Sequence, residues 1–282
     1  LYKRAARFDD AEATLTAVVE NPDATPARRV DATLLLAGIA RTQGRLDDAR
    51  TLAETARGLT ETEGLPARQA RALIMLGVLA RLRGDLDAAE SFHREALVLA
   101  ETTTDEEAAD DARGHLGLVL QTRDDFGAAV PLLEAALAGE TARGNPIGQA
   151  QWAGNLGAVA LRRNDLDAAE RYISQSAEIG ERLGAREGLA QDLSNLGVIA
   201  ISRGDIDLAA ERFERALGIA REVGLDELEP SLLANLGYLA SDRGDPTAAC
   251  EYWAEAQSGL EALNSPLAEQ IAGARAESCP PA

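Results

Sequence analysis

The fold is decided by residues 66–104, PARQARALIMLGVLARLRGDLDAAESFHREALVLAETTT, which read as two helices joined by a tight turn. Pro66 suits the first turn of a helix, where its missing N–H costs nothing. The apolar residues that follow are spaced three and four apart, which places them on one stripe of a helix. Gly84 can then adopt the left-handed conformation that stops this helix, and Asp85 can cap the next one. The stretch therefore predicts a helical hairpin.

The hairpin pattern returns every 40 residues along the chain. The turn residue of each copy falls at one repeat position, which holds Gly44, Gly84, Asp124, Asn164, Gly204 and Gly244. A fixed period of this length predicts a solenoid, in which each repeat packs on its neighbours. We expect a truncated repeat at residues 1–25, six full repeats, and a capping helix with a tail at 265–282. The six repeats are predicted at 26–65, 66–105, 106–145, 146–185, 186–225 and 226–264.

A small residue also recurs inside the first helix of each repeat. Its positions hold Ala37, Gly77, Gly117, Gly157, Gly197 and Gly237. Glycine in a helix interior costs about 1 kcal/mol relative to alanine, so a glycine that recurs needs a packing reason. We expect a neighbouring helix to pass so close that a Cβ atom would clash.

The residues of this unit resemble the tetratricopeptide repeat (TPR). The pattern of that family, with Leu-Gly in the first helix, Gly in the turn and two Ala in the second helix, is present as Leu76-Gly77, Gly84, Ala89 and Ala96. The 40-residue form is similar to the variant in the Pins/LGN spindle adaptors and in many bacterial regulatory proteins. The resemblance implies an all-α, right-handed superhelical solenoid of tandem helix-turn-helix repeats with a C-terminal capping helix.

The chain is strongly acidic, with a formal charge of −19 and Lys3 as its only lysine. This balance disfavours binding to nucleic acid, which needs cations to displace condensed counterions, and it disfavours binding to anionic membranes. Four explanations of the acidity stay open: solubility, basic partners, adaptation to a salt-rich cytoplasm, and a GC-rich genome that uses arginine in place of lysine.

The cysteines and the ends of the chain bear on localisation. Cys250 and Cys279 match no metal-binding motif, and two lone thiols indicate a reducing compartment rather than a secreted disulfide framework. The sequence contains no signal peptide and no apolar run long enough to cross a bilayer. We therefore expect a cytoplasmic protein. Because the chain starts at Leu1 inside a repeat, it looks like a fragment of a longer protein.

Side chains that could carry catalysis are scarce. His93 falls where sister repeats carry large apolar residues, so we interpret it as a packed structural residue. His115 lies four residues after Asp111 on the same helical face, but two potential ligands do not make a metal site. The sequence has no order typical of a catalytic triad, no Walker loop and no dinucleotide-binding motif. It predicts no enzymatic activity, no cofactor and no metal.

The tripeptide Arg-Gly-Asp occurs three times, at 83–85, 203–205 and 243–245. An adhesion motif contains the same residues. Here the repeat position explains them, because a helix end, a left-handed stop and the cap of the next helix follow one another. We therefore interpret the tripeptide as structural.

A row of amides is the strongest candidate for a binding surface. Two residues before the repeated glycine lie Asn155, Asn195 and Asn235. Asparagine is mildly unfavourable in a helix interior, and its amide offers a donor and an acceptor to an extended peptide backbone. In peptide-binding TPR domains this position lines the concave groove. By that resemblance the groove candidates are Asn155, Asn195, Asn235, Arg71, His115, Gln151, Gln191 and Tyr238. The alternative is that the amides bridge adjacent repeats.

These residues predict a scaffold for protein–protein or peptide interaction. The carboxylate clamp of chaperone adaptors needs lysine and arginine beside asparagine, and that pattern is absent here. We therefore expect the groove to bind an extended, neutral-to-basic segment of a protein or peptide. Two other functions stay open. One is a ligand-sensing or autoinhibitory arm of a larger bacterial transcription regulator or signalling ATPase, and the other is a structural spacer. The oligomeric state is also open.

Overall fold

The computed structural model of the chain describes residues 2–279, and its side chains from residue 8 onward. Leu1 and residues 280–282, which belong to the predicted truncated repeat and tail, lie outside the described residues. The described chain folds into fourteen α-helices, as predicted for an all-α repeat protein. Their bounds are α1 (Tyr2–Glu20), α2 (Pro26–Thr42), α3 (Leu46–Glu63), α4 (Pro66–Leu82), α5 (Leu86–Thr102), α6 (Glu106–Thr122), α7 (Phe126–Arg143), α8 (Pro146–Arg162), α9 (Leu166–Leu183), α10 (Arg186–Ser202), α11 (Ile206–Val223), α12 (Glu229–Asp242), α13 (Pro246–Ala262) and α14 (Leu267–Ser278).

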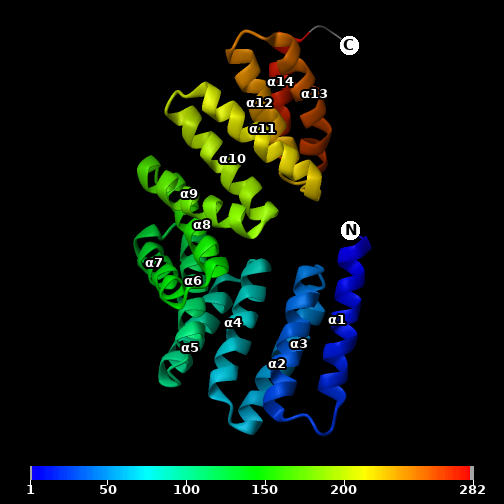
Figure 1. Cartoon of the computed structure of the whole chain (residues 1–282), viewed down its shortest axis with the longest axis vertical. Helices are drawn as coiled ribbons and strands as arrows, with labels where there is room; N and C mark the ends of the chain where they lie inside the picture. Colours follow the sequence, from blue (N-terminus) through cyan, green and yellow to red (C-terminus); the bar gives the residue numbers. More distant parts are fainter. Residues whose placement is uncertain (1, 280–282) are drawn as a thin grey trace. The chain divides into compact units, whose positions relative to one another are not determined.

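The helices group into two compact units, unit 1 (Leu1–Asn145) and unit 2 (Pro146–Ala282). In each unit the helices pair into hairpins, such as α4 with α5 and α10 with α11 (Figure 1). We call α2, α4, α6, α8, α10 and α12 the first helices, and α3, α5, α7, α9, α11 and α13 the second helices. Within a unit, neighbouring first helices also contact each other, as α4 does with α2 and α6, and α8 with α10. The first helices α2, α4 and α6 of unit 1 therefore lie side by side, as do α8 and α10 of unit 2.

The turns between helices follow the predicted chemistry. Gly84 has φ 80°, and where the repeat carries another residue that residue also adopts a positive φ, as Asp124 does at 61°. The backbone at these positions is left-handed, which is why glycine and asparagine recur there. Asp85 then caps α5, because its Oδ1 accepts a hydrogen bond of 3.0 Å from the N–H of Ala88.

At four of these turns the preceding residue is an arginine that reaches back to the repeat before it, namely Arg83, Arg123, Arg203 and Arg243. Arg203 pairs with Asp167 at 2.7 Å, and Arg83 pairs in the same way with Asp47. Both aspartates are almost fully exposed, so each pair adds about 1 kcal/mol at most. Every residue of the Arg-Gly-Asp tripeptide thus has a structural role in the repeat, as the sequence predicted.

Each recurring glycine of the first helices faces a large side chain of the second helix in the same repeat. We call positions 37, 77, 117, 157, 197 and 237 the hole positions and positions 53, 93, 133, 173, 213 and 253 the knob positions. A Cβ atom on Gly197 would lie 2.7 Å from Cε1 of Phe213, and one on Gly77 would lie 2.4 Å from Cε1 of His93. The expected clash is therefore confirmed, but with a side chain in most repeats rather than with a helix backbone.

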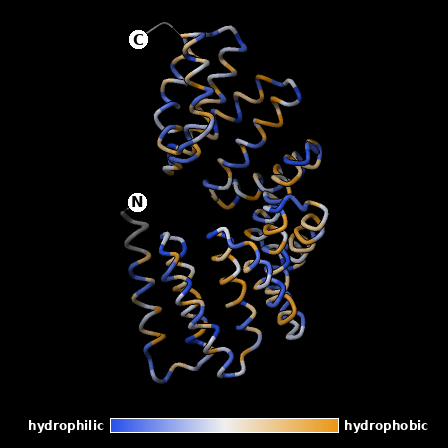
Figure 2. Tube along the Cα trace, turned by 180° about the vertical axis from the view of Figure 1, so that it is seen from behind, coloured by the Kyte–Doolittle hydropathy of each residue, from blue (hydrophilic) through white to orange (hydrophobic). Residues whose placement is uncertain are grey.

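The core of unit 2 runs through α10, α11, α12 and α13 and continues to the last helix. Trp253 and Phe213 are buried within it, and Ile271 of α14 is fully buried against it. In Figure 2 hydrophobic and hydrophilic residues alternate along the helices of both units. Helix α14 packs on α13 and covers apolar surface at the end of the unit.

Cys250 and Cys279 form a disulfide bond, with their Cα atoms 5.7 Å apart. The prediction of two lone thiols was wrong, because α14 returns along α13 and brings the end of the chain back to the start of α13. Helix α14 continues to Ser278. The cysteines therefore give no support for a reducing compartment. Among residues 2–279, no helix has the length and apolarity that crossing a membrane requires.

Candidate functional site

The predicted amide row lies on three first helices of unit 2, with Asn155 in α8, Asn195 in α10 and Asn235 in α12. All three side chains are half-buried. Asn155 Nδ2 donates to the carbonyl of Gln151 at 2.9 Å, and Gln191 Nε2 donates to Asn195 Oδ1 at 3.5 Å. Among the described residues, none of the three asparagines forms a hydrogen bond to another repeat. Their carbonyl or amide groups thus keep capacity for further hydrogen bonds.

Apolar side chains border the amide row on the same helices. Val198 and Ile201 of α10 are exposed, at 40% and 38% of their surface, although they lie one turn from buried core residues. The ring of Tyr238 on α12 packs edge-on against Trp253, with the ring centroids 5.4 Å apart. This contact fixes the tyrosine ring, so its hydroxyl is a preorganised polar group beside an apolar strip.

A hollow of about 720 Å³ opens between α10 and the segment that leads into α12. Its walls include Gln191 and Ser194 of α10 and the carboxylates of Asp226 and Glu227. The hollow exists because α12 begins at Glu229, three residues later than the repeat period predicts. Pro230 explains the shift, since proline fits the first turn of a helix but not its interior.

The two remaining groove candidates, Arg71 and His115, lie in unit 1, so the eight predicted residues fall into two separate sets. Arg71 of α4 pairs with Asp105 at 3.3 Å and with Glu107 at 3.0 Å. Its charge is therefore already matched by two carboxylates at the start of α6, since Asp105 caps that helix and Glu107 lies in its first turn. The sequence did not reveal this pairing, because it depends on the contact between the start of α6 and the preceding first helix.

His115 stacks on His93 with the ring centroids 5.4 Å apart and the rings 15° from parallel. His93 is fully buried, as its knob position predicted. Burial, together with the charges of His115 and Arg81, lowers the pKa of His93 to about 3. Burial and the charges of Arg81 and Arg41 lower the pKa of His115 to about 4. Both imidazoles are therefore neutral at pH 7.

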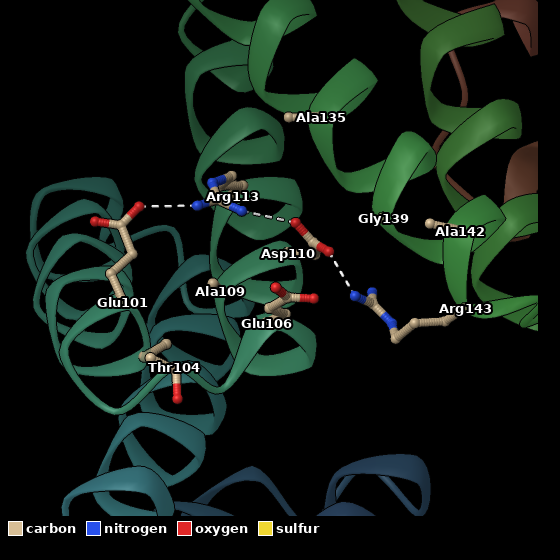
Figure 3. Close-up of a pocket in the computed structure, with 11 residues that line it drawn as sticks. Glu101, Thr104, Glu106, Ala109, Asp110, Arg113, Ala135, Gly139, Ala142 and Arg143 are labelled. Atoms are coloured by element: carbon tan, nitrogen blue, oxygen red, sulfur yellow. Dashed lines mark hydrogen bonds and ion pairs between the residues drawn. The ribbon is translucent and has the colours of Figure 1, made fainter.

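A second hollow, of about 460 Å³, lies in unit 1 between α5, α6 and α7 (Figure 3). Asp110, only 6% exposed, stands at its centre and pairs with Arg113 and Arg143, each at 2.7 Å. Gly139 makes the space, because a Cβ atom there would lie 1.7 Å from Asp110 Oδ2. Sister repeats carry apolar residues at the position of Asp110 and mostly leucine or isoleucine at that of Gly139. This hollow was not predicted from the sequence, although these departures from the repeat signal it.

The described part of the chain contains no group of three or more His, Cys, Asp or Glu side chains placed to hold a metal ion. The hollow of Figure 3 is a network of paired charges, in which both arginines are matched by carboxylates. What the unit 2 surface offers is different. It combines amide donors and acceptors, a fixed tyrosine and exposed aliphatic side chains, which are the groups that recognise an extended peptide.

Solved structures similar to this chain are helical-repeat proteins. BtubC from P. vanneervenii is 24% identical, with a TM-score of 0.66, over 79% of this chain and 92% of its own. A Signal Transduction ATPase with Numerous Domains that carries a tetratricopeptide repeat sensor, from Pyrococcus horikoshii, is 13% identical with a TM-score of 0.73. That match covers 93% of this chain and 41% of the ATPase. A Rap protein complexed with competence and sporulation factor is 16% identical with a TM-score of 0.65, over 88% and 73% of the two chains.

The sequence comparisons are consistent with these folds. Curated proteins give no significant match to the chain. The family model that describes the MalT-like TPR region matches residues 31–270, which is most of the chain. The TPR resemblance is thereby confirmed, whereas the closer likeness to the Pins/LGN variant stays a prediction. This chain belongs to the TPR proteins, in the family of the MalT-like TPR region.

Proposed function

We propose that this chain is a non-catalytic interaction module, which binds an extended protein or peptide segment on the first helices of unit 2. The observation that carries the proposal is the amide row of Asn155, Asn195 and Asn235 beside the exposed side chains of Val198 and Ile201. The amides would pair with the backbone of the segment, and the aliphatic strip would take its apolar side chains. Gln151, Gln191 and Tyr238 would extend the same surface.

The charge of the surface favours a neutral-to-basic segment. The hollow beside Gln191 is lined by the carboxylates of Glu187, Asp226 and Glu227, and no arginine or lysine lines it. A lysine or arginine of the bound segment would be attracted there, whereas an acidic residue would be repelled. The family also supports an interaction scaffold, and one structural neighbour, the Rap protein, is a complex with competence and sporulation factor.

The test is to replace the amide row and to measure binding of a selected peptide. A linear peptide is selected on the wild-type chain from a random library, and its affinity is measured by fluorescence polarisation. The triple replacement Asn155→Ala, Asn195→Ala and Asn235→Ala should weaken binding while the circular dichroism spectrum stays unchanged. Gln175→Ala, which removes an amide from second helix α9, is the control and should bind as the wild type does.

Two results would contradict the proposal. In the first, the triple variant binds the selected peptide with wild-type affinity, which means that the amides do not contact it. In the second, the triple variant loses thermal stability but binds normally per folded molecule, which means that the amides are structural. A preference of the selected peptides for aspartate and glutamate would contradict the neutral-to-basic partner.

A second candidate function is a sensor arm within a larger signalling protein. The observation that favours it is the match to a signal transduction ATPase that carries a tetratricopeptide repeat sensor, which covers 93% of this chain and only 41% of the ATPase. The coding sequence upstream of Leu1 distinguishes the two functions. A nucleotide-binding or DNA-binding domain in the same reading frame would favour the sensor arm, and further repeats would argue against it.

A further inference from the structure

The acidic hollow of unit 2 contains two carboxylates that no cation of the described chain matches. Asp226 and Glu227 line this hollow, and both side chains are exposed. The acidic residues that flank them in the sequence are each paired with an arginine, Glu222 with Arg186 and Glu229 with Arg221. Within the part of the chain that the structure describes, neither Asp226 nor Glu227 forms an ion pair. The hollow therefore holds negative charge that the protein itself does not neutralise.

The late start of α12 explains why these carboxylates lie in the hollow. In a regular repeat, residues 226 and 227 would lie in the first turn of the helix, where the helix dipole stabilises acidic side chains. Here residues 225–228 form a turn instead, in which the N–H of Leu228 donates to the carbonyl of Leu225 at 3.0 Å. The two carboxylates therefore lie before the helix, on one wall of the hollow.

A buried hydroxyl lines the same hollow from α10. Ser194 is only 7% exposed, and its hydroxyl forms no hydrogen bond with any residue that the structure describes. The sister repeats carry no polar residue at this position, which holds Leu34, Ile74, Gly114, Gly154 and Ala234. Burial of a hydroxyl without a hydrogen bond is unfavourable. A serine at an otherwise apolar position therefore indicates a hydrogen-bond donor that enters the hollow from outside the chain.

Gln191 connects the hollow to the amide row. Its side chain lines the hollow, and its Nε2 donates to Asn195 Oδ1 at 3.5 Å. The Oε1 atom of Gln191 therefore remains an acceptor for a donor in the hollow. Ser231 of α12 adds a second hydroxyl, and no arginine or lysine lines the hollow. The hollow thus presents carboxylate, amide and hydroxyl oxygens from α10, from the turn and from the start of α12.

We propose that this hollow is a pocket for a guanidinium group, the side chain of an arginine in the segment that the amide row binds. A guanidinium carries five N–H donors in a planar fork, so it can donate to acceptors on both walls of the pocket. An ammonium has three donors on one atom and is more strongly hydrated, so it fits these spread acceptors less well. The pocket rests on the proposed function and names the residue of the bound segment that it recognises.

The test uses a small probe, so that it does not depend on the rest of the peptide surface. N-acetylarginine methylamide is titrated into the isotopically labelled chain at constant ionic strength, and the backbone amide resonances are followed by NMR. The resonances of Ser194 and of residues 224–228 should shift saturably. The citrulline derivative, which has the shape of arginine without its charge, should not bind. The lysine derivative should bind more weakly than the arginine derivative.

Variants connect the binding to the groups that line the pocket. Asp226→Asn and Glu227→Gln keep the side-chain shape, and each should weaken binding of the arginine probe about fivefold, the upper end for an exposed charge pair. Ser194→Ala should weaken it about tenfold, the loss of one hydrogen bond to a charged group. This variant should fold normally, because Ala234 occupies the equivalent position in the next repeat. Glu211→Gln, at an exposed residue of α11 outside the pocket, is the control and should leave binding unchanged.

The inference is wrong if the arginine probe does not shift these resonances saturably, or if Glu211→Gln weakens its binding as much as Glu227→Gln does. It is also wrong if the citrulline or lysine derivative binds as tightly as the arginine derivative, since the pocket then does not recognise a guanidinium. The triple asparagine variant should bind the small probe as the wild type does. A selected peptide that needs the amide row but not Asp226, Glu227 or Ser194 would contradict the pocket and leave the proposed function intact. The two failures are therefore distinguishable.

Discussion

Replacement of Gly197 by alanine gives the sharpest test of the packing between the helices of a repeat. The added Cβ atom would lie 2.7, 2.8 and 2.9 Å from Cε1, Cζ and Cδ1 of Phe213. The ring is fully buried, and because protein interiors are closely packed it can give way to the added atom only at a cost. Overpacking of this kind costs about 3 kcal/mol at the upper end of its range, and the better helix propensity of alanine returns about 1 kcal/mol. We expect a net loss of about 2 kcal/mol.

Gly218→Ala is the matched control. Gly218 lies in the interior of α11, is exposed, and has no atom within 4 Å of the position of an added Cβ. The same chemical change should here increase stability by about 1 kcal/mol, because only helix propensity is altered. The two variants should therefore differ by about 3 kcal/mol in opposite directions from the wild type. Urea unfolding followed by circular dichroism measures this difference in the free energy of unfolding. It appears as a shift of the urea concentration at the midpoint while the dependence on urea (the m-value) stays constant.

A second replacement separates the clash from every other effect of the glycine. Phe213→Ala alone should cost about 3–5 kcal/mol, since it empties a large buried volume. In that background Gly197→Ala should no longer destabilise, because the ring that it meets is gone. Repeat 1 already has this arrangement, with Ala37 at the hole position and Ala53 at the knob position. The reasoning is refuted if Gly197→Ala is as stable as Gly218→Ala, or if its cost is the same with and without the phenylalanine ring.

Three further predictions concern buried polar groups and the disulfide. Burial raises the pKa of Asp192 to about 6 against a hydrogen bond from Ser176 that lowers it. The free energy of unfolding of the wild type should therefore fall as the pH rises from about 4 to 6, because the folded state must then hold a buried carboxylate. Asp192→Asn should be more stable than the wild type by up to about 3 kcal/mol at pH 7 and by little at pH 4, as measured by urea unfolding. Reduction of the Cys250–Cys279 disulfide, which spans 29 residues, should cost about 3–4 kcal/mol, whereas a Cys250→Ser variant should not respond to dithiothreitol in thermal melts. His93→Leu, which removes two unpaired ring nitrogens, should stabilise the chain by about 1 kcal/mol in the same melts.

The features that the sequence predicted correctly depend on short stretches of backbone. A left-handed stop at Gly84 and a cap at Asp85 require only the conformations and side chains of adjacent residues. A glycine recurs at the repeat position of Gly197, so the sequence also indicated close packing there, although it did not show which side chain packs against it. The disulfide was missed because pairing of Cys250 with Cys279 depends on how the last helix returns along α13, which no local pattern specifies.

The groove residues show the same limit at the level of a site. The repeat period predicted that Asn155, Asn195 and Asn235 lie on equivalent first helices, because residues 40 positions apart occupy the same place in successive hairpins. It did not reveal that Arg71 is matched by Asp105 and Glu107, since ion pairing depends on rotamers and on the neighbouring repeat.

Both hollows lie next to a pair of facing positions, one in the first helix and one in the second helix of a repeat, at which the larger side chain has moved to the first helix. This change can be read from the sequence. The residue of the first helix at position 110 faces position 139, and the one at 230 faces 259, a separation of 29 residues in each case. Sister repeats place a small or medium apolar residue at the first position and usually a larger one at the second, as in Ala190 and Ile219.

In two repeats the order of sizes is reversed. Asp110 faces Gly139, and Pro230 faces Gly259, where an added Cβ atom would lie 2.4 Å from Cγ of the proline. The charged hollow of unit 1 contains the first pair, and the acidic hollow of unit 2 lies at the displaced start of α12 that Pro230 causes. A solenoid of this kind can therefore create a recess without lengthening a loop. Placing the larger side chain of a facing pair in the first helix, and glycine in the second, leaves the 40-residue period unchanged. A glycine 29 residues after an atypical first-helix residue is consequently a sequence signal for such recesses in related repeats.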